Sequence, residues 1–296
     1  MGWVGSSIAI SVLHRGFSNE LLINDVNGDV AEGEAMDFIH GSSFFPSTSI
    51  RACSIAEMKN CSIIVITAGR GGKPGETRLD LFHDNIQIAK HISSQLGGFE
   101  GLLVIVSNPV DVLTYFYQKF TAIPASKVIG TGTMLDTSRL RTMIGQKINV
   151  DPRSIHANVI GEHGDSEVVL WSRVLIGDLP IRKWRSWKTE YEEEITHQVR
   201  TAAYEIIKRK GATNHAIGLV TANLLDWLLR GERRIVNVSS VLTGYYGLDD
   251  VALSVPTLID GDGVVEIQEY DISKDELEML SKSAAVIKKA INDFSY

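Results

Sequence analysis

One histidine of the chain lies in a turn whose neighbours could support acid–base chemistry. His163 occurs in the segment GEHGDS, directly after an apolar run that predicts a strand. The imidazole of histidine titrates near neutral pH, so it can both donate and accept a proton in one reaction cycle. A surface turn histidine would look the same, so this residue alone does not establish an active site.

Two other segments place charged side chains at a spacing suited to a reaction. Asp136 and Arg139 lie three residues apart in TGTMLDTSRLR, which could be only a helix ion pair worth about 0.2–0.5 kcal/mol. Arg78 begins a predicted helix in GKPGETRLDL, where the helix dipole disfavours a cation. For each residue a structural role is commoner than a functional one, but together with His163 they match one mechanism.

The first residues contain part of a dinucleotide-binding pattern. Gly2 and Gly5 are spaced like the last two glycines of G-x-G-x-x-G, and Asp25 ends a predicted strand about 20 residues later. In such a site the glycines let backbone amides approach a pyrophosphate, while the acid binds ribose hydroxyls and disfavours the 2′-phosphate of NADP. The motif also needs a strand and a first glycine, which do not precede Met1. A chance pairing of a helix start with an acid is the alternative.

The apolar pattern predicts the elements that must hold these residues. In the first half, predicted strands at 20–26, 61–69, 101–109 and 127–132 alternate with predicted helices at 8–13, 81–96 and 112–120. This alternation predicts a Rossmann-type, doubly wound parallel sheet. Such sheets bind ligands at the carboxyl ends of their strands, where Gly, Asn and Asp residues cluster here.

The second half has a different pattern. Strands are predicted at 155–164 and 168–177, and helices at about 189–210 and 213–229. Three later runs, at 234–242, 251–259 and 264–270, indicate an antiparallel sheet, and Ser273 with Glu276 forms a capping box for the last helix. We therefore expect an α/β protein with a dinucleotide-binding domain over 1–132 and an α+β catalytic domain over 133–296, with the helix at 213–229 able to pack on the first domain.

Composition and charge exclude some classes of partner. The net charge of −7 gives no general attraction to nucleic acid or to anionic membranes. The aromatic and basic segment WRSWK (184–188) is followed by an acidic run, so we expect an exposed, loosely packed connection there. Cys53 and Cys61 are too few for a disulfide framework and lack metal-ligand spacing. With no apolar run long enough to span a membrane, these features predict a cytoplasmic protein without a metal.

Six segments together resemble the L-lactate dehydrogenase branch of the lactate/malate dehydrogenase family, especially its bacterial members. They are TAG with GETRLDL, SNPVD, IGTGTMLDTSRLR, GEHGDS, KGATNHAIG and LSVP, and they occur in this order over the whole chain. The resemblance implies an NAD-dependent oxidoreductase that interconverts an L-2-hydroxy acid and its 2-oxo acid, in the first place L-lactate and pyruvate.

The resemblance implies a role for each charged residue. His163 would exchange a proton with the substrate oxygen, and Asp136 would bind the other ring nitrogen. Arg139 would hold the substrate carboxylate with two parallel hydrogen bonds, a geometry that lysine cannot supply. Arg78 would lie on a loop that closes over the substrate and polarises its carbonyl. Substrate contacts are also expected from Asn108, Thr213 and Gly72. Cofactor contacts are expected from Gly2, Val4, Gly5, Asp25, Thr67, Ala68, Gly69, Asn108 and Ile217.

The chain departs from the family pattern at the residue that selects the substrate side chain. Six positions before Arg78, lactate enzymes usually have glutamine and malate enzymes arginine, whereas this chain has Gly72. Glycine cannot pair the second carboxylate of oxaloacetate, so malate is disfavoured unless Arg70 or Lys73 reaches the site. The missing side chain also leaves space. We therefore expect lactate first, with broader L-2-hydroxy acids close behind.

Two further residues match an effector site of the bacterial enzymes. Arg141 and His156 occupy the positions that bind fructose 1,6-bisphosphate across a subunit interface, which implies an allosteric homotetramer. A helix surface arginine and a strand histidine are the plain alternatives.

The incomplete phosphate-binding loop suggests a second class of function. Relatives have a strand and one more glycine before the residue that aligns with Met1. A catalytically silent subunit that does not bind NAD is therefore the alternative hypothesis. The presence of every expected catalytic residue favours an enzyme.

Overall fold

The computed structural model describes residues 1–71 and 78–294, except for the side chains of residues 78–80. Gly72 and the side chain of Arg78, both predicted to lie in the active site, fall outside the described part of the chain. None of the described helices is both long and apolar enough to cross a membrane.

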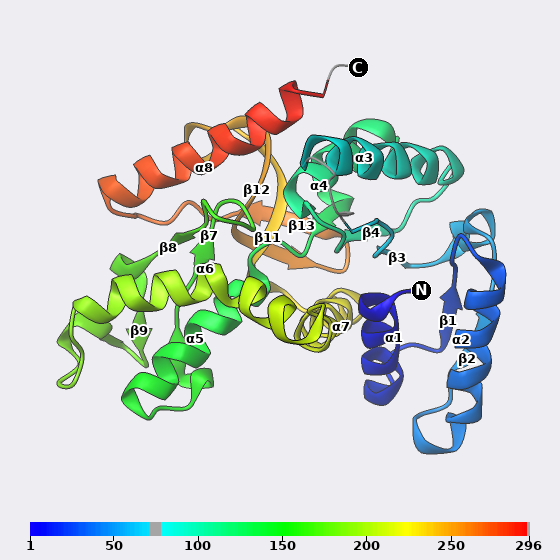
Figure 1. The fold of residues 1–296 in the computed structure, drawn as a ribbon, viewed down its shortest axis with the longest axis horizontal. Coiled ribbons are helices and arrows are strands. Elements are labelled where there is room, and N and C mark those ends of the chain that lie inside the picture. Colours follow the sequence, from blue (N-terminus) through cyan, green and yellow to red (C-terminus); the bar gives the residue numbers. More distant parts are fainter. Residues whose placement is uncertain (72–77, 295–296) are drawn as a thin grey trace.

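A six-stranded mixed sheet forms the centre of the molecule (Figure 1). The strand order is β13-β12-β11-β5-β4-β3, in which β3, β4 and β5 are parallel and the others antiparallel. The strands are β3 (Ile63–Ile66), β4 (Leu102–Ile105), β5 (Val128–Gly130), β11 (Arg234–Thr243), β12 (Asp249–Asp260) and β13 (Gly263–Ile267). Ser239 of β11 pairs with Gly130 of β5, so the parallel and antiparallel strands predicted for the two halves join in one sheet.

Helices cover both faces of this sheet, as the doubly wound pattern predicts. Alternate residues of β4 point to opposite faces: Leu103 and Ile105 pack with α3, α4 and α8, whereas Leu102 and Val104 pack with α1 and α7. These helices are α1 (Trp3–Arg15), α3 (Arg78–Gln95), α4 (Val110–Phe120), α7 (His215–Arg230) and α8 (Lys274–Asn292). The predicted capping box of Ser273 and Glu276 is present at the start of α8.

A separate parallel pair, β1 (Glu20–Ile23) and β2 (Ser49–Ala52), packs with α2 (Gly28–His40). Among the described residues, no strand joins this pair to β3 by hydrogen bonds. The sequence pattern did not predict α2 or β2. In α2 only Ala31 and Ala35 are buried, so the segment lacks the apolar period that marks a core helix.

The remaining elements surround α5 (Met134–Ile148), which follows β5, and α6 (Glu190–Lys210). The two strands predicted at 155–164 and 168–177 are in fact short pieces, because turns and a 3₁₀ helix at Trp171–Arg173 interrupt them. These pieces are β6 (Ile155–His156), β7 (Val159–Ile160), β8 (Val168–Val169), β9 (Leu175–Ile176) and β10 (Leu179–Pro180).

The expectation that residues 184–188 form an exposed, loosely packed connection is wrong for the two tryptophans, whereas residues 185, 186 and 188 are exposed as predicted. Trp184 and Trp187 pack against the apolar cluster between α5 and α6. The Trp187 ring lies 5.7 Å from that of Trp171, and its indole N–H donates to Glu192 at 3.4 Å. The two tryptophans of this segment are thus part of the apolar packing between α5 and α6 and do not form an exposed binding surface.

Candidate active site

Helix α5 places two of the predicted residues at the end of the parallel strands. Asp136 lies in its first turn, where the helix dipole favours a negative charge, and is only 2% exposed. The Arg139 guanidinium donates from Nη1 to Oδ1 of Asp136 at 2.6 Å. The ion pair that the spacing predicts is therefore present, but it is buried and not on the helix surface. The other two guanidinium nitrogens of Arg139, Nε and Nη2, have no hydrogen-bond partner among the described residues.

His163 completes this arrangement from a different segment. Its Nδ1 lies 2.5 Å from Oδ2 of Asp136, so each oxygen of that carboxylate has its own partner. The His163 side chain is 23% exposed, and its Nε2 has no hydrogen-bond partner among the described residues. An ionised Asp136 fixes the ring with the proton on Nδ1 and leaves Nε2 available for chemistry.

The charges in this group favour an imidazolium. Burial alone would lower the pKa of His163, but the charge of Asp136 and its hydrogen bond outweigh burial and raise the pKa to about 9. Burial likewise opposes ionisation of Asp136, yet the charges and hydrogen bonds of His163 and Arg139 hold its pKa below the usual value. The three side chains therefore form a cation–anion–cation series at neutral pH.

Two predicted substrate residues lie in other segments. Asn108 follows β4 and is exposed, and its carbonyl accepts a hydrogen bond from the Asn85 amide at 3.5 Å. Thr213 is half-buried in the short connection between α6 and α7. Neither forms a hydrogen bond with Asp136, Arg139 or His163 in the described part of the chain, so their substrate contacts stay predictions.

The start of α1 has the features that a bound pyrophosphate requires. Gly2 is its N-cap, and no described side chain caps the helix. A Cβ at Gly2 would have no atom within 4 Å, whereas one at Gly5 would lie 3.1 Å from the Thr67 hydroxyl. The loop is thus open on one side and close to the end of β3 on the other. Asp25 accepts hydrogen bonds from the Met1 amino group and from the Asn27 backbone at 2.9 Å.

The other predicted cofactor residues lie around this loop. The carbonyl of Ala68, between Thr67 and Gly69, accepts the Ser107 hydroxyl at 2.6 Å, which ties the ends of β3 and β4 together. Val4 and Ile217 pack against the same apolar cluster. Uncapped amides and a nearby carboxylate suit an anionic pyrophosphate and a ribose diol, so the residues present fit a dinucleotide.

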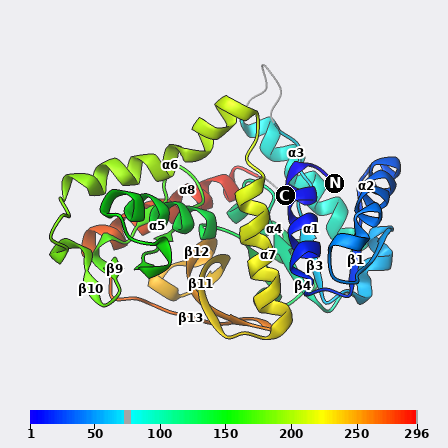
Figure 2. The same cartoon turned by 90° about the horizontal axis from the view of Figure 1, so that it is seen from below.

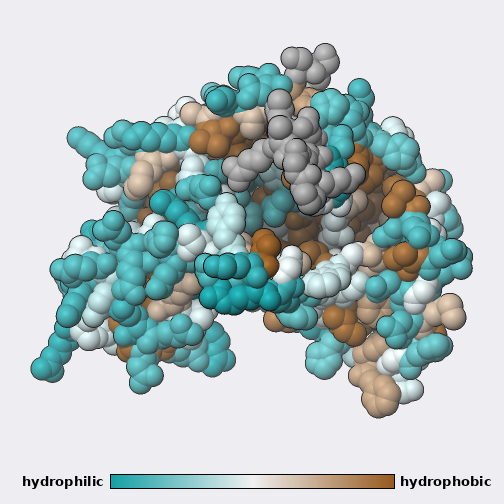
Figure 3. Space-filling view, in the orientation of Figure 1, coloured by the Kyte–Doolittle hydropathy of each residue, from teal (hydrophilic) through white to brown (hydrophobic). Residues whose placement is uncertain are grey.

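Helix α7 lies directly beside α1 (Figures 1 and 2). A Cβ at Gly218 would come within 2.7 Å of the Ser7 carbonyl oxygen, so only glycine permits this approach. The Asn214 amide also donates to the Ser7 hydroxyl at 2.9 Å. Figure 3 shows a hollow in this face beside α7, and apolar residues are visible in it.

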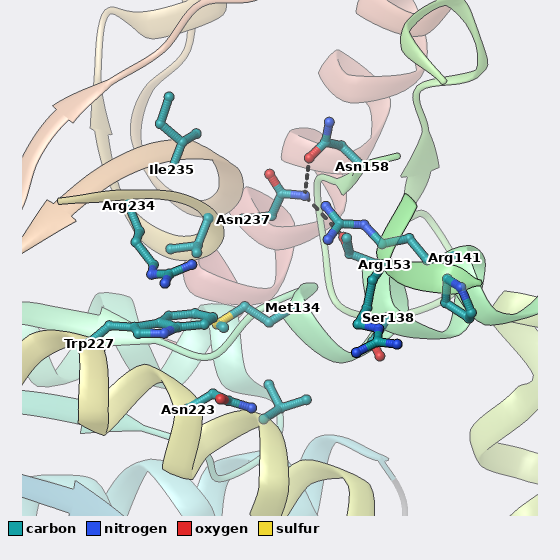
Figure 4. Close-up of a pocket in the computed structure, with 14 residues that line it drawn as sticks. Met134, Ser138, Arg141, Arg153, Asn158, Asn223, Trp227, Arg234, Ile235 and Asn237 are labelled. Carbon is teal, nitrogen blue, oxygen red and sulfur yellow. Dashed lines mark hydrogen bonds between the residues drawn. The ribbon is translucent and has the colours of Figure 1, made fainter. Parts of the chain in front are cut away.

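The two predicted effector residues are neighbours but point to different surroundings. Arg141 donates from Nε and Nη2 to the carbonyl of Ala157 at 3.2 and 3.1 Å. His156 immediately precedes Ala157 in the chain and is exposed on β6. Arg141 also lines a pocket of about 430 Å³ between α5, α7 and β11, which does not include His156. In Figure 4, Arg141 lies on one side of this pocket and Trp227 with Arg234 on the other.

Comparison with known protein families accounts for both halves of the chain. Residues 1–130 match the family description "lactate/malate dehydrogenase, NAD binding domain", and residues 133–295 match "lactate/malate dehydrogenase, alpha/beta C-terminal domain". The chain belongs to the lactate/malate dehydrogenase family. The resemblance predicted from the six sequence segments is confirmed, as is the nucleotide-binding character of the first half.

Relatives within the lactate/malate dehydrogenase family agree over the full length. The chain is 41% identical to L-lactate dehydrogenase of Synechococcus sp. (strain JA-3-3Ab), with 100% of this chain and 97% of that protein covered. It is 43% identical to L-lactate dehydrogenase of Lactococcus lactis subsp. cremoris (strain MG1363), with 98% and 95% covered. The ligand-bound crystal structure of minor L-lactate dehydrogenase from Enterococcus mundtii superposes with a TM-score of 0.97 at 39% identity, covering 100% of this chain and 96% of that one.

One buried carboxylate of the site was missed at the sequence level. Asp111, in the segment SNPVD, accepts the backbone N–H of His163 at 2.7 Å. The segment helped to identify the family, but its aspartate follows a proline at a helix start, where an acid is common. No sequence signal links this residue to His163, because the contact joins residues 52 positions apart.

Proposed function

We propose that this chain catalyses the NAD-dependent interconversion of L-lactate and pyruvate. The observation that carries the proposal is the buried series Arg139–Asp136–His163, with bonds of 2.6 and 2.5 Å. It places a proton donor and a free guanidinium edge on either side of one carboxylate. A 2-oxo acid needs both groups: a proton for its carbonyl oxygen and a cation for its carboxylate.

Each residue has a role in this proposal. His163 donates from Nε2 to the carbonyl oxygen of pyruvate and takes the proton back from lactate. Asp136 keeps the ring in the required tautomer and stabilises its charge. Arg139 binds the substrate carboxylate through its two nitrogens that are free of described partners. Arg78 polarises the carbonyl as the lid closes, and Asn108 contacts the same oxygen.

The remaining predicted residues form the walls of the substrate and cofactor sites. Thr213 and Gly72 border the substrate side chain. Gly2, Gly5 and Asp25 would hold the pyrophosphate and the adenosine ribose of the cofactor. When bound, the reduced nicotinamide supplies the hydride that the substrate carbon accepts. Residues 1–132 would then form the cofactor domain and residues 133–296 the substrate domain.

Substrate selection tests this proposal against its alternatives. We expect kcat/KM to be highest for pyruvate, with 2-oxobutyrate and 2-oxoisocaproate within about tenfold, because Gly72 leaves room and a lost contact changes preference by about 1–3 kcal/mol. Dominant activity with oxaloacetate would make the chain a malate enzyme. Absence of NADH binding in a fluorescence titration would instead support the silent subunit.

The pH dependence should follow the ionisation of His163. Pyruvate reduction needs the imidazolium, so its kcat/KM should be constant below pH 9 and fall about tenfold per pH unit above the pKa of about 9. Lactate oxidation needs the neutral ring and should fall as the pH drops below the same value. Initial rates in both directions, measured with saturating cofactor, give the two profiles. Profiles that cross near pH 6.5, the ordinary histidine pKa, would contradict the proposed Asp136–His163 coupling.

We also propose that the chain assembles as a homotetramer that responds to fructose 1,6-bisphosphate. Large apolar side chains on α1 and α7 support an assembly: Trp3 is 61% and Leu219 is 59% exposed. Arg141 supports an anion site, because its guanidinium is paired with a carbonyl and with no described carboxylate. His156, exposed on β6 next to the Ala157 whose carbonyl Arg141 binds, would add a second donor outside that pocket.

Adding the bisphosphate should lower the pyruvate concentration at half-saturation and increase the tetramer fraction in analytical ultracentrifugation. Arg141→Gln should abolish both responses, because it removes a guanidinium that can bind a phosphate at two points. Arg51→Gln is the matched control: its side chain is 45% exposed, pairs with Glu57 at 3.1 Å and does not line this pocket. An unchanged saturation curve and tetramer fraction in the unmodified chain would exclude the effector site.

A further inference from the structure

A second carboxylate holds His163 at a point away from its ring. Asp111, in the first turn of α4, is 2% exposed. Its Oδ2 accepts the backbone N–H of His163 at 2.7 Å, and its Oδ1 accepts the Ser239 hydroxyl at 2.6 Å. Both oxygens of a buried acid are therefore committed to two other elements of the fold.

The surroundings allow Asp111 to carry a charge. Burial raises its pKa to about 6, while the Ser239 hydroxyl and the His163 backbone N–H oppose that rise. The N-terminal end of α4 also favours a negative charge in its first turn. Above pH 6 a buried negative charge therefore stands beside the loop of His163, where water screens it little.

The elements around Asp111 form a closed frame. Ser239 lies fully buried on β11 and pairs with Gly130 at the end of β5, and α5 with Asp136 follows shortly after. A Cβ at Gly130 would lie 2.9 Å from that of Ser239, so the strands approach closely here. His163 is thus fixed twice: its backbone from α4 and β11 through Asp111, and its ring from α5 through Asp136.

We propose that Asp111 is a positioning residue for the proton transfer, anchoring the backbone of His163 and placing a second negative charge near its imidazolium. This inference rests on the proposed role of His163 and deepens it. Proton transfer depends on alignment within a few tenths of an ångström, and a ring held only at Nδ1 could still move with its loop.

The charged groups that act on His163 come from three segments. Asp136 and Arg139 lie on α5, and Asp111 lies on α4. Glu167 lies further along the loop of His163 itself, where burial raises its pKa to about 8, so it is mostly uncharged at neutral pH. Removing the charge of Asp111 leaves intact the hydrogen bond that Nδ1–H of His163 donates to Asp136. The pKa of His163 should then fall, because the charge of Asp111, like that of Asp136, favours the imidazolium.

Asp111→Asn separates charge from shape. The amide oxygen can still accept the His163 N–H, and its NH₂ group can donate to Ser239. In the pH profile of pyruvate reduction, kcat/KM falls at high pH, and we call this part of the profile the basic limb. We expect the basic limb to move down by about 1 pH unit, with the Kd for NADH unchanged. A ¹³C-histidine NMR titration should show the same shift in His163 without requiring turnover. Asp165→Asn is the matched control, because this exposed acid of the same loop bonds only to Tyr204 among the described hydrogen bonds.

Ser239→Ala tests the anchor without removing the charge. We expect kcat to fall about threefold, with the KM for pyruvate and the pH at which the rate falls unchanged, since Asp111 keeps its charge but loses one of the two hydrogen bonds that fix it. A basic limb and a His163 titration that stay in place in a folded Asp111→Asn variant would overturn the proposal. If that variant does not fold, an unchanged kcat in Ser239→Ala overturns it. Failure of the unmodified chain to reduce any 2-oxo acid would refute the proposed function, and the NMR titration would still test the anchoring.

Discussion

Replacing His163 with glutamine should lower kcat/KM for pyruvate by about three orders of magnitude. General acid catalysis by a positioned side chain contributes about 10²–10⁴-fold, and His163 has the only ring nitrogen in the described Asp136–Arg139 group that is exposed and free of partners. Glutamine retains a hydrogen-bond donor but cannot release a proton to the forming alcohol. The loss should appear in kcat, measured as NADH oxidation at saturating pyruvate.

His197→Gln provides the matched control for this change. His197 is exposed on α6, and its described contact is a backbone carbonyl that accepts the Thr201 hydroxyl. The control should have unchanged kinetics, and both variants should bind NADH as the unmodified chain does. If His163→Gln keeps more than a tenth of the original kcat/KM, His163 is not the proton donor.

Elements with a strong local signal could be predicted closely from the sequence. The predicted helices at 189–210 and 213–229 correspond to α6 (Glu190–Lys210) and α7 (His215–Arg230). Both end at a glycine with positive φ, Gly211 and Gly231, a conformation that stops a helix and that sequence analysis can anticipate. The three antiparallel strands were also predicted, because each contains a short run rich in apolar and β-branched residues.

Elements that depend on tertiary contacts were predicted less well. The strand predicted at 20–26 ends at Ile23, because the following Asn24 uses its side chain to bind the Cys53 carbonyl. The strand predicted at 155–164 breaks after His156, and Gly161 has a φ of +88° that ends the second piece. An apolar run shows that a segment is buried, but it does not show where ladder hydrogen bonds stop.

The site shows a similar division. Motifs of the family identified Asp136, Arg139 and His163 individually, and the fold brings them within hydrogen-bond distance. The buried acid Asp111 and its partner Ser239 carried no comparable signal, because they lie 128 positions apart and meet only when α4 packs on β11. The chemistry limits which residue types can react, so motifs reveal them. Residues that only support them depend on tertiary contacts, which the sequence does not show.

Arg139→Lys should raise the KM for pyruvate about a hundredfold while leaving the pH profile in place. Arginine offers two parallel N–H groups to a carboxylate, whereas lysine offers a single ammonium group that Asp136 can capture at this position. Losing one charge-assisted hydrogen bond costs roughly 1.5–3 kcal/mol, which is about 10–100-fold in affinity, and the competition with Asp136 places the effect at the upper end.

The pH profile distinguishes this loss from damage to the proton donor. Lysine keeps the positive charge that faces Asp136 and His163, so the basic limb near pH 9 should not move. Arg182→Lys is the matched control. Arg182 lies away from the site and forms two hydrogen bonds with the Glu192 carboxylate, of 2.9 and 2.7 Å. An unchanged KM in Arg139→Lys would show that the substrate carboxylate binds elsewhere. A shifted basic limb with an unchanged KM would instead show that Arg139 acts on the pKa of His163 and does not bind the substrate. A residue that binds the substrate carboxylate must change the KM when its hydrogen bonds are lost.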